Sequence, residues 1–145
     1  MRRDPILTSF IMSTVFLLFW YRITGGVLGY DNYKWLSPTS LIVGVLVTNI
    51  RQLLVIIINE DTRIGRILLR DNKEYLIELH RTMNVTTLGF LSSALIGGFT
   101  LYLGHESKYL SILEVWINSF SIILLAILIL NIQQLYEDYY ELEKH

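Results

Sequence analysis

The sequence contains no cysteine and only two prolines among its 145 residues. Without cysteine the chain has no disulfide, no thiolate metal site and no thiol nucleophile. Its three histidines, His80, His105 and His145, are scattered and form no HExxH pattern. No serine or threonine lies in a known nucleophile motif. We therefore predict that the protein is not an enzyme and that it holds no metal and no cofactor.

An excess of one charge is also missing, because 12 Lys and Arg against 13 Asp and Glu give a net charge of −1. Acidic residues are interleaved with the basic ones, so no single-sign patch forms. Binding to a phosphate backbone needs such a patch. We predict that the protein does not bind nucleic acid directly.

Long apolar runs are what the sequence has in abundance, and hydrophobic residues make up 52% of the chain. About 20 apolar residues are enough for a helix to cross the hydrocarbon core of a bilayer. We predict an all-α membrane protein in which residues 1–145 form one transmembrane domain. Its four transmembrane helices are expected at about residues 5–21, 38–58, 83–103 and 112–131.

The first run resembles a signal peptide, because Met1-Arg2-Arg3 precedes it. However, Phe19-Trp20-Tyr21-Arg22 offers no pair of small residues for cleavage. We predict a retained span.

The segment between the second and third runs, residues 59–82, is too charged for hydrocarbon. We predict a cytoplasmic helical hairpin in which the second span continues as a helix to about Arg70. Asp71-Asn72 is the best turn signal, and a new helix is expected near Lys73. Ser37-Pro38 predicts the start of the second span, with the proline at the first helical position. The acidic tail, residues 132–145, is expected to continue the fourth helix.

Lysine and arginine counts predict the orientation. Eight of these residues lie in the amino end, the hairpin and the tail, whereas the two other loops hold Arg22, Lys34 and Lys108. Loops rich in Lys and Arg stay in the cytoplasm. We predict a multi-pass protein of the cell inner membrane with both termini in the cytoplasm.

The second span carries an unusual group of polar residues, Thr48, Asn49, Arg51 and Gln52. An arginine at the centre of a membrane helix costs about 2.5–3.5 kcal/mol on insertion scales. One interpretation is a cytoplasm-facing polar vestibule or pore. The alternative is that Arg51 reaches the inner headgroups, or Glu60 or Glu137. The residues predicted to lie at its depth, which could solvate it, are Ser9, Ser13, Thr86, Thr87 and Asn131.

Glu114 and Asn118 share one face of the fourth span, and Glu114 is predicted to lie near its outer end. It could pair there with Arg22, Lys34 or Lys108. Alternatively, Glu114 and Asn118 could line an outer vestibule of an oligomer.

The third span carries small residues at steps of four, Gly89, Ser93 and Gly97. Such a ridge lets helix backbones approach closely. It could serve packing inside one chain or self-association. Polar faces on at least two spans exceed what one small bundle readily satisfies, so we predict a homo-oligomer.

Four basic residues on the hairpin, Arg63, Arg66, Arg70 and Lys73, are predicted to face the acidic tail. They could pair with that tail, bind anionic membrane lipids, or dock a soluble cytoplasmic protein.

The span order, the charged hairpin and the segment Gln134-Leu135-Tyr136 resemble the small membrane component of the Rex exclusion system of lambdoid phage. The layout is also similar to that of the membrane half of the Kiwa antiphage system. These resemblances imply a sensor or ion-leak element that responds to infection together with a cytoplasmic protein.

Three functions are therefore open. The first is a bacterial antiphage or stress component that couples a membrane event to a soluble partner. The second is a homo-oligomeric ion channel with Arg51 near its inner mouth. The third is a non-catalytic accessory subunit of a larger membrane complex.

Overall fold

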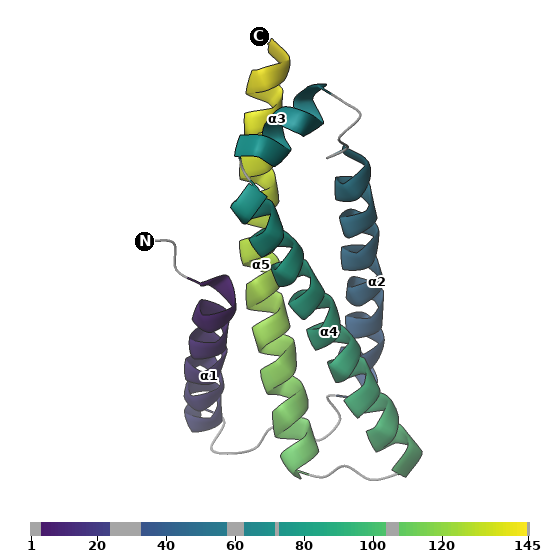
Figure 1. The fold of residues 1–145 in the computed structure, drawn as a ribbon. Helices are drawn as coiled ribbons and strands as arrows, with labels where there is room; N and C mark the ends of the chain where they lie inside the picture. Colours follow the sequence, from purple (N-terminus) through teal and green to yellow (C-terminus); the bar gives the residue numbers. More distant parts are fainter. Residues whose placement is uncertain (1–3, 24–32, 58–62, 72, 104–107, 145) are drawn as a thin grey trace.

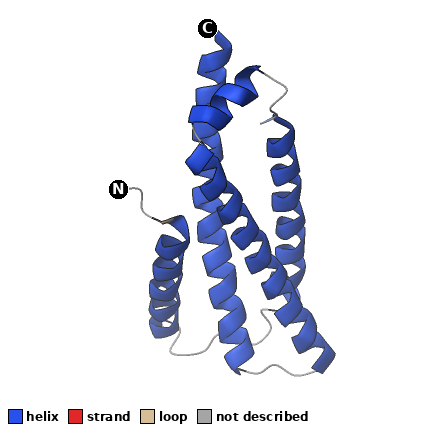
Figure 2. Ribbon diagram, viewed as in Figure 1, coloured by secondary structure: helices blue, strands red, loops and turns tan. Residues whose placement is uncertain are grey.

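The computed structural model describes residues 4–23, 33–57, 63–71, 73–103 and 108–144. Over these residues the elements are all helices, as Figure 2 shows, which confirms the predicted all-α class. They are α1 (Pro5–Ile23), α2 (Tyr33–Ile57), α3 (Arg63–Asp71), α4 (Lys73–Leu103) and α5 (Lys108–Lys144). Residues 24–32, 58–62 and 104–107, and Asn72 of the predicted turn, lie outside the described residues.

The long helices alternate in direction (Figure 1). In that view α1 and α4 run downward, whereas α2 and α5 run upward. Helices α2, α4 and α5 pack together, and α1 packs mainly against α5. The short helix α3 lies across the upper part of α5 and contacts both α4 and α5.

The start of α1 is explained by its first residues. Asp4 Oδ1 accepts a hydrogen bond from the Ile6 backbone N–H at 3.0 Å, which is the bond of a helix N-cap. Pro5 occupies the first helical position, where its missing N–H has no partner to lose.

The predicted boundaries of the second span need two corrections. Helix α2 begins at Tyr33, so Pro38 lies inside the helix rather than at its first position. There its missing N–H removes one hydrogen bond of the helix. In addition, α2 and α3 are separate helices, so no single helix continues to Arg70. The reason is that α3 turns to pack on α4 and α5 instead of extending away from them.

The returning half of the predicted hairpin and the third span form one helix. Helix α4 starts at Lys73, as predicted, and continues through 31 residues to Leu103. Helix α5 has 37 residues and includes the whole predicted acidic tail up to Lys144. At 1.5 Å per residue the two are about 46 and 55 Å long, against about 28 Å for α1.

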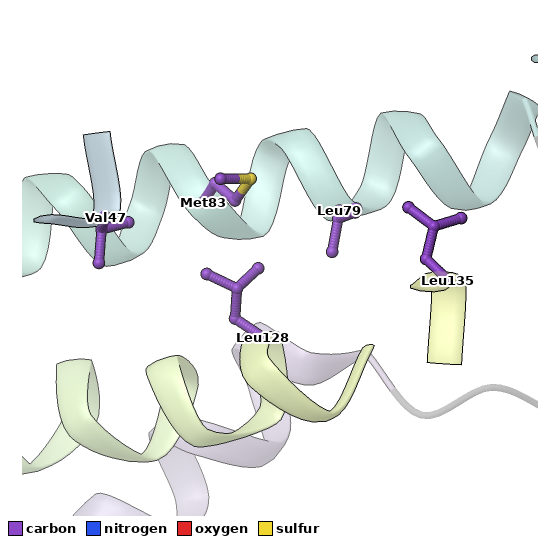
Figure 3. Close-up of a cluster of buried hydrophobic side chains, with 5 residues drawn as sticks. All are labelled: Val47, Leu79, Met83, Leu128 and Leu135. Carbon is purple, nitrogen blue, oxygen red and sulfur yellow. The ribbon is translucent and has the colours of Figure 1, made fainter. Parts of the chain in front are cut away.

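The interior near α3 is apolar. Val47, Leu79, Met83, Leu128 and Leu135 form a buried cluster contributed by α2, α4 and α5 (Figure 3). Burying such side chains is worth about 1.5–3 kcal/mol each relative to exposure in water. This half of the bundle therefore has the core of a water-soluble protein.

The interior of the other half is polar. Its buried side chains include Ser40, Ser93, Ser111, Glu114 and Asn118. The outside of this half is apolar, as on α1, where only Pro5, Ser9 and Ser13 are buried. Large hydrophobic side chains exposed around it include Leu18, Leu41, Ile42, Leu88, Leu95, Phe99, Ile122 and Leu130.

Two helices in the described part of the chain, α1 and the Tyr109–Glu141 stretch of α5, are long and apolar enough to cross a membrane. An exposed apolar face of this size is uncommon on a soluble monomer. Both observations support association with a membrane.

Candidate functional site

The polar interior is joined by one amide, that of Asn118 on α5. Its Oδ1 accepts a hydrogen bond from Ser40 Oγ of α2 at 2.9 Å, and its Nδ2 donates to Ser93 Oγ of α4. Ser40 and Ser93 also lie within hydrogen-bond distance of each other, at 3.4 Å. All three side chains are at least 95% buried. The side chain of Asn118 therefore links α5 to both α2 and α4 by hydrogen bonds.

Glu114 lies one turn before Asn118 and is only 2% exposed. A Cβ atom placed on Gly97 of α4 would be 2.9 Å from Glu114 Oε1 and 2.8 Å from Ser37 Oγ of α2. Glu114 Oε1 and Ser37 Oγ thus both lie close to the backbone of Gly97, where a larger residue would have its side chain. Ser37 Oγ also donates to the Ala94 carbonyl of α4 at 2.9 Å, which fixes this junction of α2, α4 and α5.

The contacts of Trp116 show which part of α1 lies beside Glu114. Half a turn further along α5, Trp116 Nε1 donates to Thr14 Oγ1 at 3.2 Å, and its ring packs edge-on against Phe10 at 5.2 Å. Thr14 is the middle residue of α1. Glu114 therefore lies within the length that α1 covers, and not beyond its end. The side chains of its predicted partners Lys34 and Lys108 lie outside the described part, and Arg22 is exposed.

The small residues of α4 lie at contacts within this chain. Gly89 faces Ser121 of α5, because a Cβ on Gly89 would overlap Ser121 Oγ and lie 3.3 Å from its Cβ. Ser93 is bonded to Asn118, and Gly97 faces Ser37 and Glu114. All three residues thus serve packing between α4 and its neighbours α2 and α5.

Arg51 is bound to α4. Its Nη1 donates to Asn84 Oδ1 at 2.7 Å, and its Nη2 lies 3.0 Å from Nε2 of the exposed His80. These partners differ from the five residues predicted to solvate it and from Glu137, while Glu60 lies outside the described residues. The partners depend on the register of α4 against α2, which brings His80 and Asn84 level with Arg51.

Arg51 also lies at one end of the apolar surface. Arg81 and Thr82, in the same turn of α4 that holds its partners, line a cavity together with Asp4 and Pro5 at the start of α1. The turn that binds Arg51 is therefore level with the beginning of α1. This position favours the interpretation in which Arg51 lies at the headgroup boundary.

The neighbours of Arg51 do not form a common polar face. Thr48 is half-buried, and its Oγ1 donates to the Gly44 carbonyl of its own helix at 3.0 Å. Asn49 and Gln52 are exposed on the outside of α2. The polar residues predicted on the second span therefore do not share one environment. Thr48 bonds to its own helix and Arg51 to α4, whereas Asn49 and Gln52 lie on the surface.

The basic residues Arg63, Arg66, Arg70 and Lys73 are all exposed. Among the described residues, none of them forms an ion pair with the acidic end of α5; Arg70 pairs with its neighbour Asp71 at 2.8 Å. That hydrogen bond, and the charge of Asp71, raise the pKa of Arg70. The predicted pairing of the hairpin with the tail is therefore absent from the described residues, because α3 lies across α5 instead of alongside it.

The acidic end of α5 makes contacts of its own. Gln133 Nε2 donates to Glu137 Oε1 at 3.4 Å, and Lys144 Nζ lies 4.5 Å from the centre of the Tyr140 ring. Asp138 and Glu141 are exposed. Both the basic and the acidic residues at this end are thus available to other molecules.

Sequence reasoning missed Ser37, Ser40, His80 and Asn84 as members of these networks. Ser37 and Ser40 carry a signal that could have been used: Ser37, Ser40, Gly44 and Val47 recur at steps of three and four, which places them on one face of a helix. His80 and Asn84 also have a spacing of four, but the sequence does not show which residue of α2 they face.

No protein-family model, no curated protein and no solved structure matches this chain.

Proposed function

We propose that the chain is a four-helix inner-membrane protein with both termini in the cytoplasm, and that its charged end binds a soluble partner. In this proposal α1, α2, α4 and α5 cross the bilayer. The α3 end, with the first turns of α4 and the last turns of α5, projects into the cytoplasm. A role in an antiphage or stress response rests on the resemblance given above and stays a prediction.

The observation that carries the proposal is the reversal of polarity along the bundle. Near α3 the core is apolar and the surface is charged, as in water, where apolar burial drives folding. In the other half the core is polar and the surface apolar. That pattern suits lipid, because helices there associate through small residues and hydrogen bonds rather than through the hydrophobic effect.

The lengths of the helices agree with this arrangement. At about 28 Å, α1 matches a hydrocarbon core of about 30 Å. Helices α4 and α5 exceed that thickness by about 15 and 25 Å. The excess supplies the part that we place in the cytoplasm.

Binding of a partner is supported by the unneutralised charge at this end. The positive charges of Arg63, Arg66 and Lys73 are not paired within the described residues. Exposed arginines can form two parallel hydrogen bonds with a carboxylate or phosphate. An acidic protein surface is therefore the partner chemistry that fits α3.

The channel interpretation receives less support. Both terminal nitrogens of Arg51 are engaged by α4, so its side chain is not turned towards a pore. The homo-oligomer stays a prediction; Ser40, Ser93 and Asn118 bond to one another inside a single chain. The proposal therefore does not need an oligomer.

The test is purification of the tagged protein from its host after replacement of Arg63, Arg66 and Arg70 by glutamate. We expect a soluble protein to copurify with the wild type and to be lost, by at least tenfold, from the triple variant. The matched control replaces the same three residues by lysine, which keeps the charge and should retain most of the partner.

Membrane insertion is measured separately, by alkaline extraction and by reporter fusions at both termini. Reporters that place either terminus outside the cytoplasm would contradict the topology. Equal recovery of the partner with the glutamate and lysine variants would contradict the role of α3.

A further inference from the structure

A crevice opens where α1 begins beside α4 and α5. It consists of two cavities, of about 220 and 300 Å³, which share Pro5, Glu78 and Thr82. We call it the α1–α4 crevice; the polar residues lining it are Asp4, Thr8, Glu74, Tyr75, Glu78, Arg81, Thr82 and Asn131. Each cavity approaches the size of a small-molecule site.

The crevice brings together charged side chains of both signs. Among the described residues, Glu74, Glu78 and Arg81 form no ion pair. Glu78 is half-buried, whereas Glu74 and Arg81 are exposed at the opening. A ligand that carries one cationic and one anionic group would match both charges at once.

The hydrogen-bond donors of the crevice are few. Thr8 Oγ1 donates to the Asp4 carbonyl and Thr82 Oγ1 to the Glu78 carbonyl, so both hydroxyl protons are used inside their own helices. Asp4 Oδ1 caps α1. Tyr75 Oη donates to the Asn131 carbonyl. The charged donors that can meet an anion are those of the Arg81 guanidinium, and the carboxylates of Glu74 and Glu78 can accept from a cation.

The surroundings of the crevice are those of a membrane surface. It lies at the first turn of α1, where the charged end of the molecule meets its apolar surface. Leu7 on α1 and Ile77 on α4 flank it and are 58% and 60% exposed. A ligand with a charged head and apolar chains could place the head in the crevice and the chains along these residues.

We propose that the α1–α4 crevice binds the headgroup of an inner-leaflet phospholipid of the phosphoethanolamine class. Its primary ammonium has three N–H donors for the Glu74 and Glu78 carboxylates, and its phosphate accepts from Arg81. A choline headgroup keeps the phosphate but has no N–H to donate. A glycerol headgroup lacks the cation, and the carboxylates repel its charge.

This inference rests on the proposed topology, which places the crevice at the inner membrane surface. It is independent of the partner proposed for α3. The two are separated by variants, because the charged crevice residues that are replaced lie on α4 and the basic residues of the partner site on α3.

The experiment is native mass spectrometry of the full-length protein in detergent, titrated with phosphatidylethanolamine, phosphatidylcholine and phosphatidylglycerol that carry identical acyl chains. Loss of a charge-assisted hydrogen bond weakens binding by about tenfold or more. We therefore expect phosphatidylethanolamine to bind about tenfold more tightly than either of the other lipids.

Substitutions test which side chains cause the preference for phosphatidylethanolamine. Glu74→Gln with Glu78→Gln should reduce phosphatidylethanolamine binding to the level of phosphatidylcholine. Arg81→Gln should weaken both of these lipids, since it contacts the phosphate that they share. The matched controls, Glu141→Gln and Arg63→Gln, remove exposed charges that do not line the crevice and should change neither.

Three results would overturn the assignment: equal binding of the ethanolamine and choline lipids, a preference that survives the double glutamine variant, or an equal loss with Glu141→Gln. Soluble phosphoethanolamine is added as a competitor. If it displaces the lipid at equal concentration, the ligand is a soluble zwitterion and the lipid assignment fails. Alkaline extraction of each variant reports insertion, so a failed topology is recognised separately.

Discussion

Gly97 and Gly98 are neighbours on α4, yet replacing each by alanine is expected to change stability in opposite directions. A Cβ on Gly97 would lie 2.8 Å from Ser37 Oγ and 2.9 Å from Glu114 Oε1, and it would overlap the Ser37 Cβ. A Cβ on Gly98 meets nothing within 4 Å. The pair therefore compares a crowded and an open position on the same turn.

The magnitudes follow from two opposing effects. Alanine is preferred to glycine inside a helix by about 1 kcal/mol, a gain that both variants share. Overpacking typically costs about 1–3 kcal/mol, and the upper part of that range applies at Gly97 because the Ser37 Cβ cannot rotate away. We expect Gly98→Ala to be neutral or stabilising and Gly97→Ala to be less stable than Gly98→Ala by about 2–3 kcal/mol.

The assay is thermal unfolding of the purified protein in a mild detergent, followed by circular dichroism of the helices. A difference of this size corresponds to roughly 5–10 °C between the two midpoints. Adding Ser37→Gly to Gly97→Ala removes the overlapping Cβ and should recover part of the loss. If the two single variants unfold at the same temperature, α2 and α4 are not in close contact at Gly97 and the packing described above is wrong.

Two further predictions concern the same interior. Gly89→Ala should lower the unfolding temperature in the wild type but much less in the presence of Ser121→Ala, because the second change removes the hydroxyl that the new Cβ overlaps; additive effects in this double-mutant cycle would show that Gly89 and Ser121 are not in contact. Asn118→Leu should reduce the free energy of unfolding by about 1–2 kcal/mol, since it leaves the Ser40 and Ser93 hydroxyls without the amide that joins them. Ser119→Leu, a half-buried position one residue away, is the control, and an equal loss there would contradict the role of the amide.

The sequence predicted the helices well because their signals are local. The apolar runs, the proline of α1 and the turn signal before Lys73 all act within a few residues, and α1, α4 and α5 begin or continue close to where they were expected. The break between α2 and α3 was missed, since it depends on α3 packing against α4 and α5, which lie far away in the sequence.

The sites were harder to predict because they depend on which residues come level with one another. Arg51 was recognised as costly, but its partners His80 and Asn84 follow only from the way α2 and α4 pack against each other. Asn118 was selected as a polar residue on an apolar helix, whereas its partners Ser40 and Ser93 come from two other helices. The opening between α1 and α4 has no sequence signature, because it arises from α1 packing mainly on α5.

The dependence of α1 on α5 also has a consequence for biosynthesis. Thr14 and its partner Trp116 are 102 residues apart, and the helix that α1 packs against is the last to be made. A domain of this kind is synthesised from its amino end. The first helix therefore leaves the ribosome long before its partner exists, and truncation within the last helix should leave α1 undocked even when α2 and α4 are already in place.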